Sequence, residues 1–441
     1  MAATKSLAVN LDHPEAAAQL HSLDAGVQLD ISCTENSQSL SLLPQLVNSS
    51  SVSSIHVDAT YRTADACRRL TQPLKQVLLS CPNLRRLSLD ISPPRAGCMV
   101  PDIPSEYCGL GFANGERPPA LESLEIIAYP WGREPNNSPI NFHALGYPEK
   151  GEELDYWATT FEWSRLGRLT LHDASSGLAF QVAPKLTTLE ELTLSQFHDA
   201  DQLRSLFLTI PSSLSTVTLP TLGPSIDIDI TILLPHAATL RKLEIHSPEH
   251  PHHPRFTEQA LLHLRDSFPQ LTHLTIDIDR AGKEWPSAIF SVLASFPSLQ
   301  ELDLWFPLGC SDDPFQPYLT ALSASHLARP LLDRSTTLQC IHLHSGCPAQ
   351  LGHGFPTQDA PWARENATSF ICARAGTEAS LTCPDLDDEA NNELRKAMQD
   401  KVTSAPAASL SRLLGQRVAF QVAVEGPLEV EEWRALHRGD E

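Results

Sequence analysis

The sequence predicts an α/β protein in which short parallel strands and helices alternate, stacked as repeats into a curved solenoid. Three observations predict it. A Leu-x-x-Leu-x-Leu phrase or a close variant returns ten times between residues 52 and 343, helix-like runs separate the copies, and prolines end several of these runs. One such unit cannot bury its own apolar side chains, so a continuous core requires stacking on its neighbours.

Each copy of the phrase predicts a strand that is entered from a turn. The second and third apolar positions lie two residues apart, which is the period of a strand with one buried face. The first apolar position comes three residues before the second and precedes the strand. The ten copies begin at Val52, Leu84, Leu121, Leu166, Leu189, Leu214, Leu240, Leu271, Leu299 and Leu338.

The segments between the phrases predict helices that stop at prolines. Proline cannot continue a helix, and it disfavours a helical conformation in the residue before it. The pairs Phe268-Pro269 and Phe296-Pro297 therefore end a helix just before the next strand begins. Four runs of this design are residues 74–80, 202–209, 257–264 and 286–293.

The spacing of the copies predicts where loops are inserted. From Leu166 to Leu299, consecutive first positions lie 23 to 31 residues apart, close to the roughly 20–29 residues of a strand-plus-helix repeat. Longer steps elsewhere predict insertions near 91–119, 128–162 and 306–335. The middle insertion is rich in tryptophan and tyrosine, so we expect it to fold back over an edge of the solenoid.

The two ends of the chain predict caps around a solenoid that spans residues 51–345. Residues 1–50 form the N-terminal cap, in which Val27, Leu29 and Ile31 make an imperfect strand. Residues 346–441 form the C-terminal cap. Its first part, up to residue 384, lacks periodicity and is expected to be loop. A helix over 385–402 and a strand over 418–424 follow and cover the apolar end of the stack.

Composition excludes several classes of protein. The net charge of −21 over 441 residues argues against a general nucleic-acid binder and favours basic partners. No window approaches the 18 or so apolar residues of a membrane span, and no signal peptide follows Met1. The ten cysteines include no Cys-x-x-Cys pair. Reduced thiols in the cytoplasm or nucleus therefore fit best.

The phrase Phe-Pro-x-Leu-x-x-Leu-x-Leu at 268–276 and 296–304 resembles leucine-rich repeats of the ribonuclease-inhibitor-like class. The irregular spacing and the Trp163-Ser164-Arg165-Leu166 lead-in resemble filamentous-fungal F-box-like leucine-rich repeat proteins, over residues 26–345. The resemblance implies a Skp1-type adaptor docked by an F-box and a ubiquitination substrate captured by the repeats. Residues 1–50 carry no Leu-Pro-x-Glu-Ile-like opening, so no F-box residue is transferred to this chain.

The side chains that flank the second and third apolar positions are expected to point to the concave face. In the last third of the repeats this face is acidic, rich in histidine and carries a tryptophan. An aromatic residue surrounded by charges is a candidate hot spot for binding a protein. The alternative for any one residue is a solvated lateral pair, such as Asp303 beside His342. The candidate partner-binding residues are His246, His273, Asp277, Glu301, Asp303, Trp305, His342 and His344.

A metal site is the weaker alternative. Cys340, His342 and His344 alternate onto one face and are zinc-ligand types, but same-face neighbours on a strand are about 6.5–7 Å apart. The sequence carries no Gly-x-Ser-x-Gly elbow, P-loop or His-Glu-x-x-His, so we expect no catalytic residue and no cofactor. The predicted function is non-enzymatic protein binding, either as an F-box-like substrate-recognition protein without a visible F-box or as a free-standing scaffold.

Overall fold

The protein is described by a computed structural model and divides into two compact units. One unit comprises Met1–Ser195 with Asp201–Leu214, and the other comprises Gln196–Ala200 with Ser215–Glu441. The division falls inside the solenoid predicted for 51–345, and each unit is described by itself. The structure describes residues 6–21, 27–61, 64–92, 109–129, 131, 152–172, 176–195, 200–220, 230–246, 256–278, 285–307, 319–346, 368–375, 378–384, 388 and 391–392.

The first unit alternates strands with helices. Its neighbouring strands pair in parallel, in the order in which they occur in the chain. The strands are β1 (Ser6–Asn10), β2 (Gln28–Cys33), β3 (Val52–Thr60), β4 (Arg86–Ser92), β5 (Ser123–Ala128), β6 (Arg168–Leu171) and β7 (Glu191–Leu194). The helices are α1 (Ala16–His21), α2 (Ser37–Leu42), η1 (Leu43–Leu46), α3 (Ala64–Ser80), α4 (Glu152–Thr160), α5 (Ser176–Val182), η4 (Ala183–Lys185) and α6 (Ala200–Thr209).

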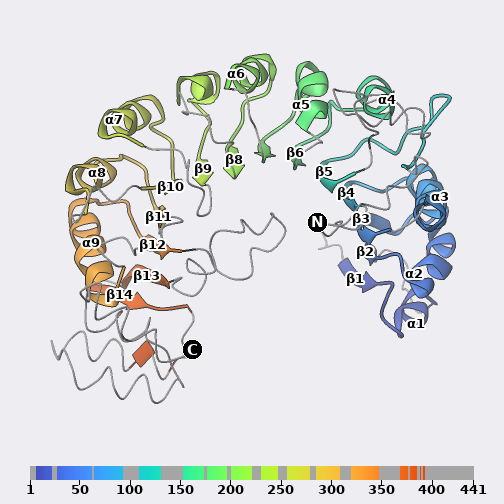
Figure 1. Cartoon of the computed structure of the whole chain (residues 1–441), viewed down its shortest axis with the longest axis horizontal. Coiled ribbons are helices and arrows are strands. Elements are labelled where there is room, and N and C mark those ends of the chain that lie inside the picture. Colours follow the sequence, from blue (N-terminus) through green and yellow to red (C-terminus); the bar gives the residue numbers. More distant parts are fainter. Residues whose placement is uncertain are drawn as a thin grey trace, which may run out of the picture. The chain divides into compact units, whose positions relative to one another are not determined.

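The second unit continues the alternation and then changes strand direction. The parallel strands are β8 (Thr216–Pro220), β9 (Lys242–His246), β10 (His273–Asp277), β11 (Glu301–Phe306) and β12 (Cys340–Ser345). Two antiparallel strands follow, β13 (Thr368–Ala375) and β14 (Glu378–Thr382). The helices are η5 (Ile230–His236), α7 (Glu258–Ser267), α8 (Ser287–Leu293) and α9 (Ala321–Arg334). Figure 1 shows α7, α8 and α9 on one side of these strands.

The repeated apolar phrase determines the register of the parallel strands. In the first unit, Leu87 lies opposite Leu124, and in the second unit Leu274 lies opposite Leu302. The second and third apolar positions of all ten copies lie within strands and are buried. Burying each such side chain contributes about 1.5–3 kcal/mol. The prediction of an α/β fold built on parallel strands is therefore confirmed.

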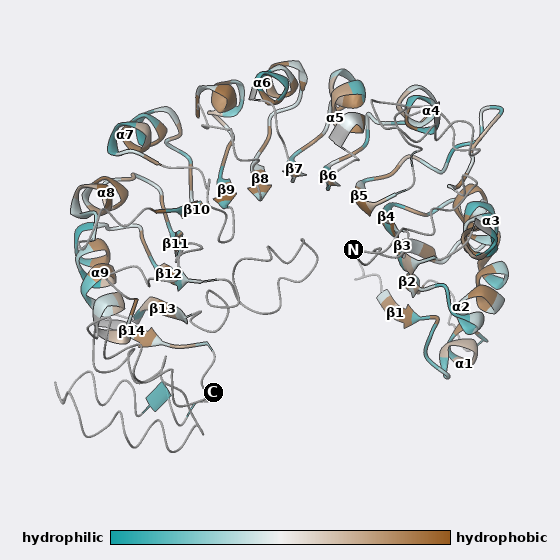
Figure 2. Ribbon diagram, viewed as in Figure 1, coloured by the Kyte–Doolittle hydropathy of each residue, from teal (hydrophilic) through white to brown (hydrophobic). Residues whose placement is uncertain are grey.

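Helices form at the four predicted runs, as α3, α6, α7 and α8, and side chains cap the first turns of α7 and α9. Thr257 is the N-cap residue just before α7, and its hydroxyl accepts a hydrogen bond from the Ala260 amide at 3.1 Å. Thr320 and Ser323 form a reciprocal capping box at the start of α9, which satisfies amides that the helix itself leaves unpaired. Figure 2 shows helices that carry both apolar and polar residues, as expected when one helix side packs on the strands.

The middle insertion contributes to the core of the first unit. Trp157 on α4 is fully buried, and its ring contacts those of Phe112, Tyr129, Trp131 and Phe161 with centroids 4.6 to 5.6 Å apart. Residues 132–151 of the insertion are outside the described part. Trp131 and Trp157 are buried, so the described part of this insertion packs into the core of the unit. Its placement over an edge of the solenoid stays a prediction.

The C-terminal region differs from the prediction. Residues 346–384 were expected to be loop, which is wrong for β13 and β14. In β13 the buried residues Phe370 and Cys372 alternate, and in β14 the buried Leu381 is followed by Cys383 just after the strand. Both alternations are too brief to stand out from their Ala- and Thr-rich surroundings. The predicted strand over 418–424 lies outside the described residues, as does most of the predicted helix over 385–402. No helix in the described ranges is both long and apolar enough to cross a membrane.

Candidate functional site

The candidate site is on the strands of the second unit. Along β9 to β12, leucine and isoleucine side chains alternate with side chains that point away from the helices. We call the surface made by the latter the helix-free face. Its residues are Lys242, Glu244, His246, His273, Thr275, Asp277, Glu301, Asp303, Trp305, Cys340, His342 and His344. Because parallel register places equivalent positions side by side, these residues form three lateral rows.

The first row is a partly exposed ion pair. His273 lies opposite Glu301 in the β10–β11 register, and its Nε2 is 3.2 Å from a carboxylate oxygen of Glu301. Both side chains keep much of their solvent contact. An ion pair of this kind contributes roughly 0–1 kcal/mol to stability.

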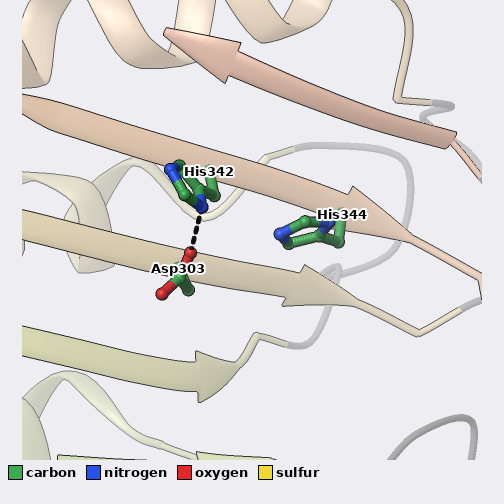
Figure 3. A group of neighbouring side chains, drawn as sticks. All are labelled: Asp303, His342 and His344. Atoms are coloured by element: carbon green, nitrogen blue, oxygen red, sulfur yellow. Dashed lines mark ion pairs between the residues drawn. The ribbon is translucent and has the colours of Figure 1, made fainter. Parts of the chain in front are cut away.

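The middle row centres on the Asp303 carboxylate. The Nδ1–H of His342, from the neighbouring strand, donates to Oδ1 of Asp303 at 2.7 Å. The hydroxyl of Thr275 donates to the other carboxylate oxygen at 3.1 Å. The second ring nitrogen of His342 lies 3.2 Å from the sulfur of Cys340. Figure 3 shows His342 reaching from β12 toward Asp303, with His344 beside the pair.

The third row holds an indole between two imidazoles. Trp305 stacks with His246 at a centroid distance of 4.1 Å and with His344 at 4.3 Å, with interplanar angles of 22° and 19°. Since β9 and β12 lie on opposite sides of β11, the two imidazoles cover opposite faces of the ring. His246 also pairs with the buried Asp277, Nδ1 to Oδ1 at 2.5 Å. Its Nε2 is buried and has no hydrogen-bond partner.

The surroundings shift the pKa values of His342, in the middle row, and His344, in the third row, in opposite directions. Burial alone would raise the pKa of Asp303, but the hydrogen bond and charge of His342 outweigh it, so this pKa lies below its usual value. The hydrogen bond to Asp303 raises the pKa of His342 to about 10. Burial lowers the pKa of His344 to about 4. At neutral pH His342 is thus an imidazolium and His344 is a neutral imidazole.

Three residues of this face lie close enough to share a metal ion. Asp303, His342 and His344 each offer one ligand atom, and these atoms lie within 4.8 Å of one another. This group differs from the metal-ligand set expected from the sequence, which was Cys340, His342 and His344. The carboxylate of Asp303, on the neighbouring strand, takes the place of the Cys340 thiol. Cys340 is in contact with His342 but does not belong to the group.

All eight predicted site residues lie on the helix-free face, in separate pairs and stacks. His273 contacts Glu301, His342 contacts Asp303, and Trp305 contacts both His246 and His344. Sequence reasoning missed Thr275 and Ser369 as supporting residues. Ser369 Oγ lies 2.8 Å from His344 Nδ1; β13 was not predicted, so nothing indicated this contact. Thr275 could have been found from the repeat register.

Comparisons with known proteins assign neither a family nor a function to this chain. A scan against protein-family models finds no matching family, and a search of curated proteins finds no match. Functional inference therefore rests on the residues of the helix-free face.

Proposed function

We propose that the chain is a leucine-rich repeat solenoid of the ribonuclease-inhibitor-like class that binds a protein partner and performs no chemistry of its own. The helix-free face would be the concave face of that solenoid. The proposal is supported by the recurring strand and helix pair, and by leucines that meet in register between neighbouring strands. A surface of parallel strands that no described helix covers offers a wide area to another protein.

The observation that carries the proposal is Trp305. This large aromatic side chain is only partly buried on a face whose other side chains are polar. Stacking on both sides holds the ring in place, so little conformational entropy remains to be lost when a partner covers it. Tryptophans of this kind, surrounded by polar groups, are enriched among residues that dominate binding energy.

Charge indicates the chemistry of the partner. The chain carries 53 acidic and 32 basic residues, and Glu301 on the helix-free face has half of its side chain exposed. Long-range attraction then favours a partner with a basic surface and raises the association rate at low salt. We propose a basic protein surface with an apolar contact for the edge of the indole that His246 and His344 leave uncovered.

Proximity labelling in the native cell tests this proposal. The wild-type chain, Trp305→Ala and His273→Ala are each fused to the labelling enzyme. We expect Trp305→Ala to lower labelling of a specific set of proteins at least about tenfold, as for a hot-spot residue. His273→Ala, a change on the same face, should leave most of that labelling. Equal labelling by all three chains would reject a binding role for Trp305.

The link to ubiquitination remains a separate proposal with its own test. A pulldown with a Skp1-type adaptor distinguishes the two forms of the function. Recovery of the adaptor favours an F-box-related substrate-recognition protein. Clean absence of the adaptor, with other specific partners recovered, favours a free-standing scaffold.

A further inference from the structure

We propose that Asp303, His342 and His344 form a binding site for a divalent first-row transition-metal ion of the Zn²⁺ class. The site would lie on the helix-free face of the second unit. This inference goes beyond the proposed function and does not depend on it, because an ion can bind the isolated chain.

The strand register brings the three side chains together. Asp303 on β11 lies opposite His342 on β12, and His344 follows two residues later on the same side of β12. Their candidate ligand atoms lie within 4.8 Å of one another. In Figure 3 one ring nitrogen of His344 is directed toward the Asp303–His342 pair. Three donors from two neighbouring strands thus converge on one point.

Hydrogen bonds outside the group orient each donor. Thr275 occupies Oδ2 of Asp303 at 3.1 Å, and Cys340 contacts Nε2 of His342 at 3.2 Å. Ser369 contacts Nδ1 of His344 at 2.8 Å. These contacts leave His344 Nε2 for the ion. The ion would take the place of the proton that now lies between His342 Nδ1 and Asp303 Oδ1, and this proton would be released to solvent. Such outer hydrogen bonds are a regular feature of histidine and carboxylate metal ligands, since they determine the ring orientation.

The distances require only small side-chain movements. Bonds of about 2.0–2.1 Å in tetrahedral geometry place neighbouring ligand atoms roughly 3.3 Å apart. Asp303 and His342 are now 2.7 Å apart, so they must separate slightly, while the other donors must close in. Both side chains are about one-third exposed, at 30% and 35%. An ion can therefore reach both side chains from solvent.

The donor types determine which ions fit. Two imidazoles and one carboxylate suit Zn²⁺, Co²⁺, Ni²⁺ or Cu²⁺, whereas Mg²⁺ and Ca²⁺ prefer oxygen ligands alone. Three protein ligands leave at least one coordination position to water. His246 does not belong to the group, because the Trp305 ring lies between it and His344.

Calorimetric titration of the full chain with ZnCl₂, after treatment with a chelator, tests the site. We expect about one equivalent to bind the wild-type chain, and no binding of MgCl₂ or CaCl₂. Ser369→Ala, which removes only an outer contact, should weaken binding roughly 10- to 100-fold. Asp303→Asn and His344→Ala should each weaken it further. Circular dichroism of each variant shows whether it is folded.

Two matched controls separate this site from other histidines. His273→Ala removes a histidine from the same face outside the group and should leave Zn²⁺ affinity unchanged. A variant with alanine at His250, His252 and His253 removes the histidine-rich segment between β9 and α7 and should also bind one equivalent. Absence of stoichiometric binding to the folded wild-type chain would overturn the proposal. So would affinity that survives both Asp303→Asn and His344→Ala, or that disappears when His250, His252 and His253 are replaced.

The outcome is independent of partner binding. The titration uses the purified chain alone, while the labelling experiment compares proteins near Trp305 in the cell. A chain that binds zinc but shows no Trp305-dependent labelling would retain this inference and lose the proposed function. The reverse result would reject only the metal site.

Discussion

Two acidic residues, one in each unit, lie beside aromatic rings. The groups that donate hydrogen bonds to their carboxyl oxygens differ in charge. Glu153 on α4 is buried among Phe112, Tyr129 and Trp157, and its Oε1 accepts hydrogen bonds from the Gly111 amide at 2.9 Å, Tyr129 at 2.8 Å and Trp157 at 3.3 Å. Asp303 accepts from an imidazole that can carry a full positive charge. The first carboxyl has neutral donors and the second has a cation.

The pKa values follow from this difference. Burial raises the pKa of Glu153 to about 7, although the hydrogen bonds from Gly111 and Trp157 and the charge of Lys75 oppose the rise. The pKa of Asp303 is lowered, because His342 outweighs burial. Neutral dipoles do not fully replace water around a buried charge, whereas a paired cation does so at a position that is about one-third exposed. Glu153 therefore belongs to the core, and Asp303 keeps a charged group available at the surface.

The largest expected effect tests whether the aromatic cluster is part of the core. Trp157→Ala removes a fully buried ring that contacts four others. It should lower the free energy of unfolding by about 3–5 kcal/mol. Trp305→Ala is the matched change on the helix-free face and should cost far less, since that ring is already partly exposed. Urea unfolding of both variants measures the contrast, and equal losses would remove the distinction between the two regions.

The pH dependence of stability sharpens the comparison. Between pH 4.5 and about 7, folded Glu153 keeps a proton that the unfolded chain has released. The free energy of unfolding should therefore fall as pH rises through this range, by up to about 3 kcal/mol in total, and level off above it. Glu153→Gln should remove this contribution.

The control for that experiment is Asp155→Asn, on the exposed side of the same helix, where Asp155 accepts from Gln181 at 2.6 Å. This variant should keep the wild-type pH profile. Thermal unfolding between pH 4.5 and 8 gives both results. A Glu153→Gln profile that retains the wild-type slope would mean that Glu153 is not the group responsible.

A smaller effect is expected from the middle row of the helix-free face. Asp303→Asn keeps the shape of the side chain and removes its charge, at a position that is about one-third exposed. We expect a loss of less than about 1 kcal/mol, measured by urea unfolding in the presence of a chelator. A loss as large as that of Trp157→Ala would indicate that the Asp303–His342 pair stabilises the fold rather than serving a ligand.

The smallest effect on the free energy of unfolding is expected for the first row of the helix-free face, the pair of His273 and Glu301. In a double-mutant cycle of His273→Ala and Glu301→Gln, the coupling energy should be about 0.2–1 kcal/mol and should shrink when salt is added. Unfolding at low and high NaCl measures it. A coupling that is large and independent of salt would contradict the assignment of this pair as a solvated lateral contact.

The sequence predicted the strands well because their signal is local. Leucines two residues apart specify a strand and its buried side, and their repetition specifies the register, so Leu274 could be placed opposite Leu302 in advance. The same alternation placed all eight candidate residues on one face. Parallel stacking also placed Asp303 beside His342 in advance, and this pair is confirmed. The spacing does not reveal that His344 joins the pair while Cys340 stays outside the group, because that depends on side-chain rotation.

The features that the sequence did not predict depend on contacts between distant segments. Glu153 in a polar helix looks like a surface residue, and only the packing of Phe112 and Tyr129 around it makes it buried. One local sign existed, because Trp157 lies four residues later on the same helix side. β13 and β14 were missed because each buries too few apolar residues to produce a visible period.

The reversal of strand direction at β13 determines where this chain could be lengthened by design. Between β10 and β11, both neighbours present the same parallel hydrogen-bonding pattern, so a duplicated segment covering residues 271–298 would find a matching template on either side. After β12, an added parallel strand would have to displace the antiparallel pairing of His342 with Ile371. We predict that a chain duplicated at the first position stays soluble and gains helical circular dichroism, and that one duplicated directly after residue 346 aggregates.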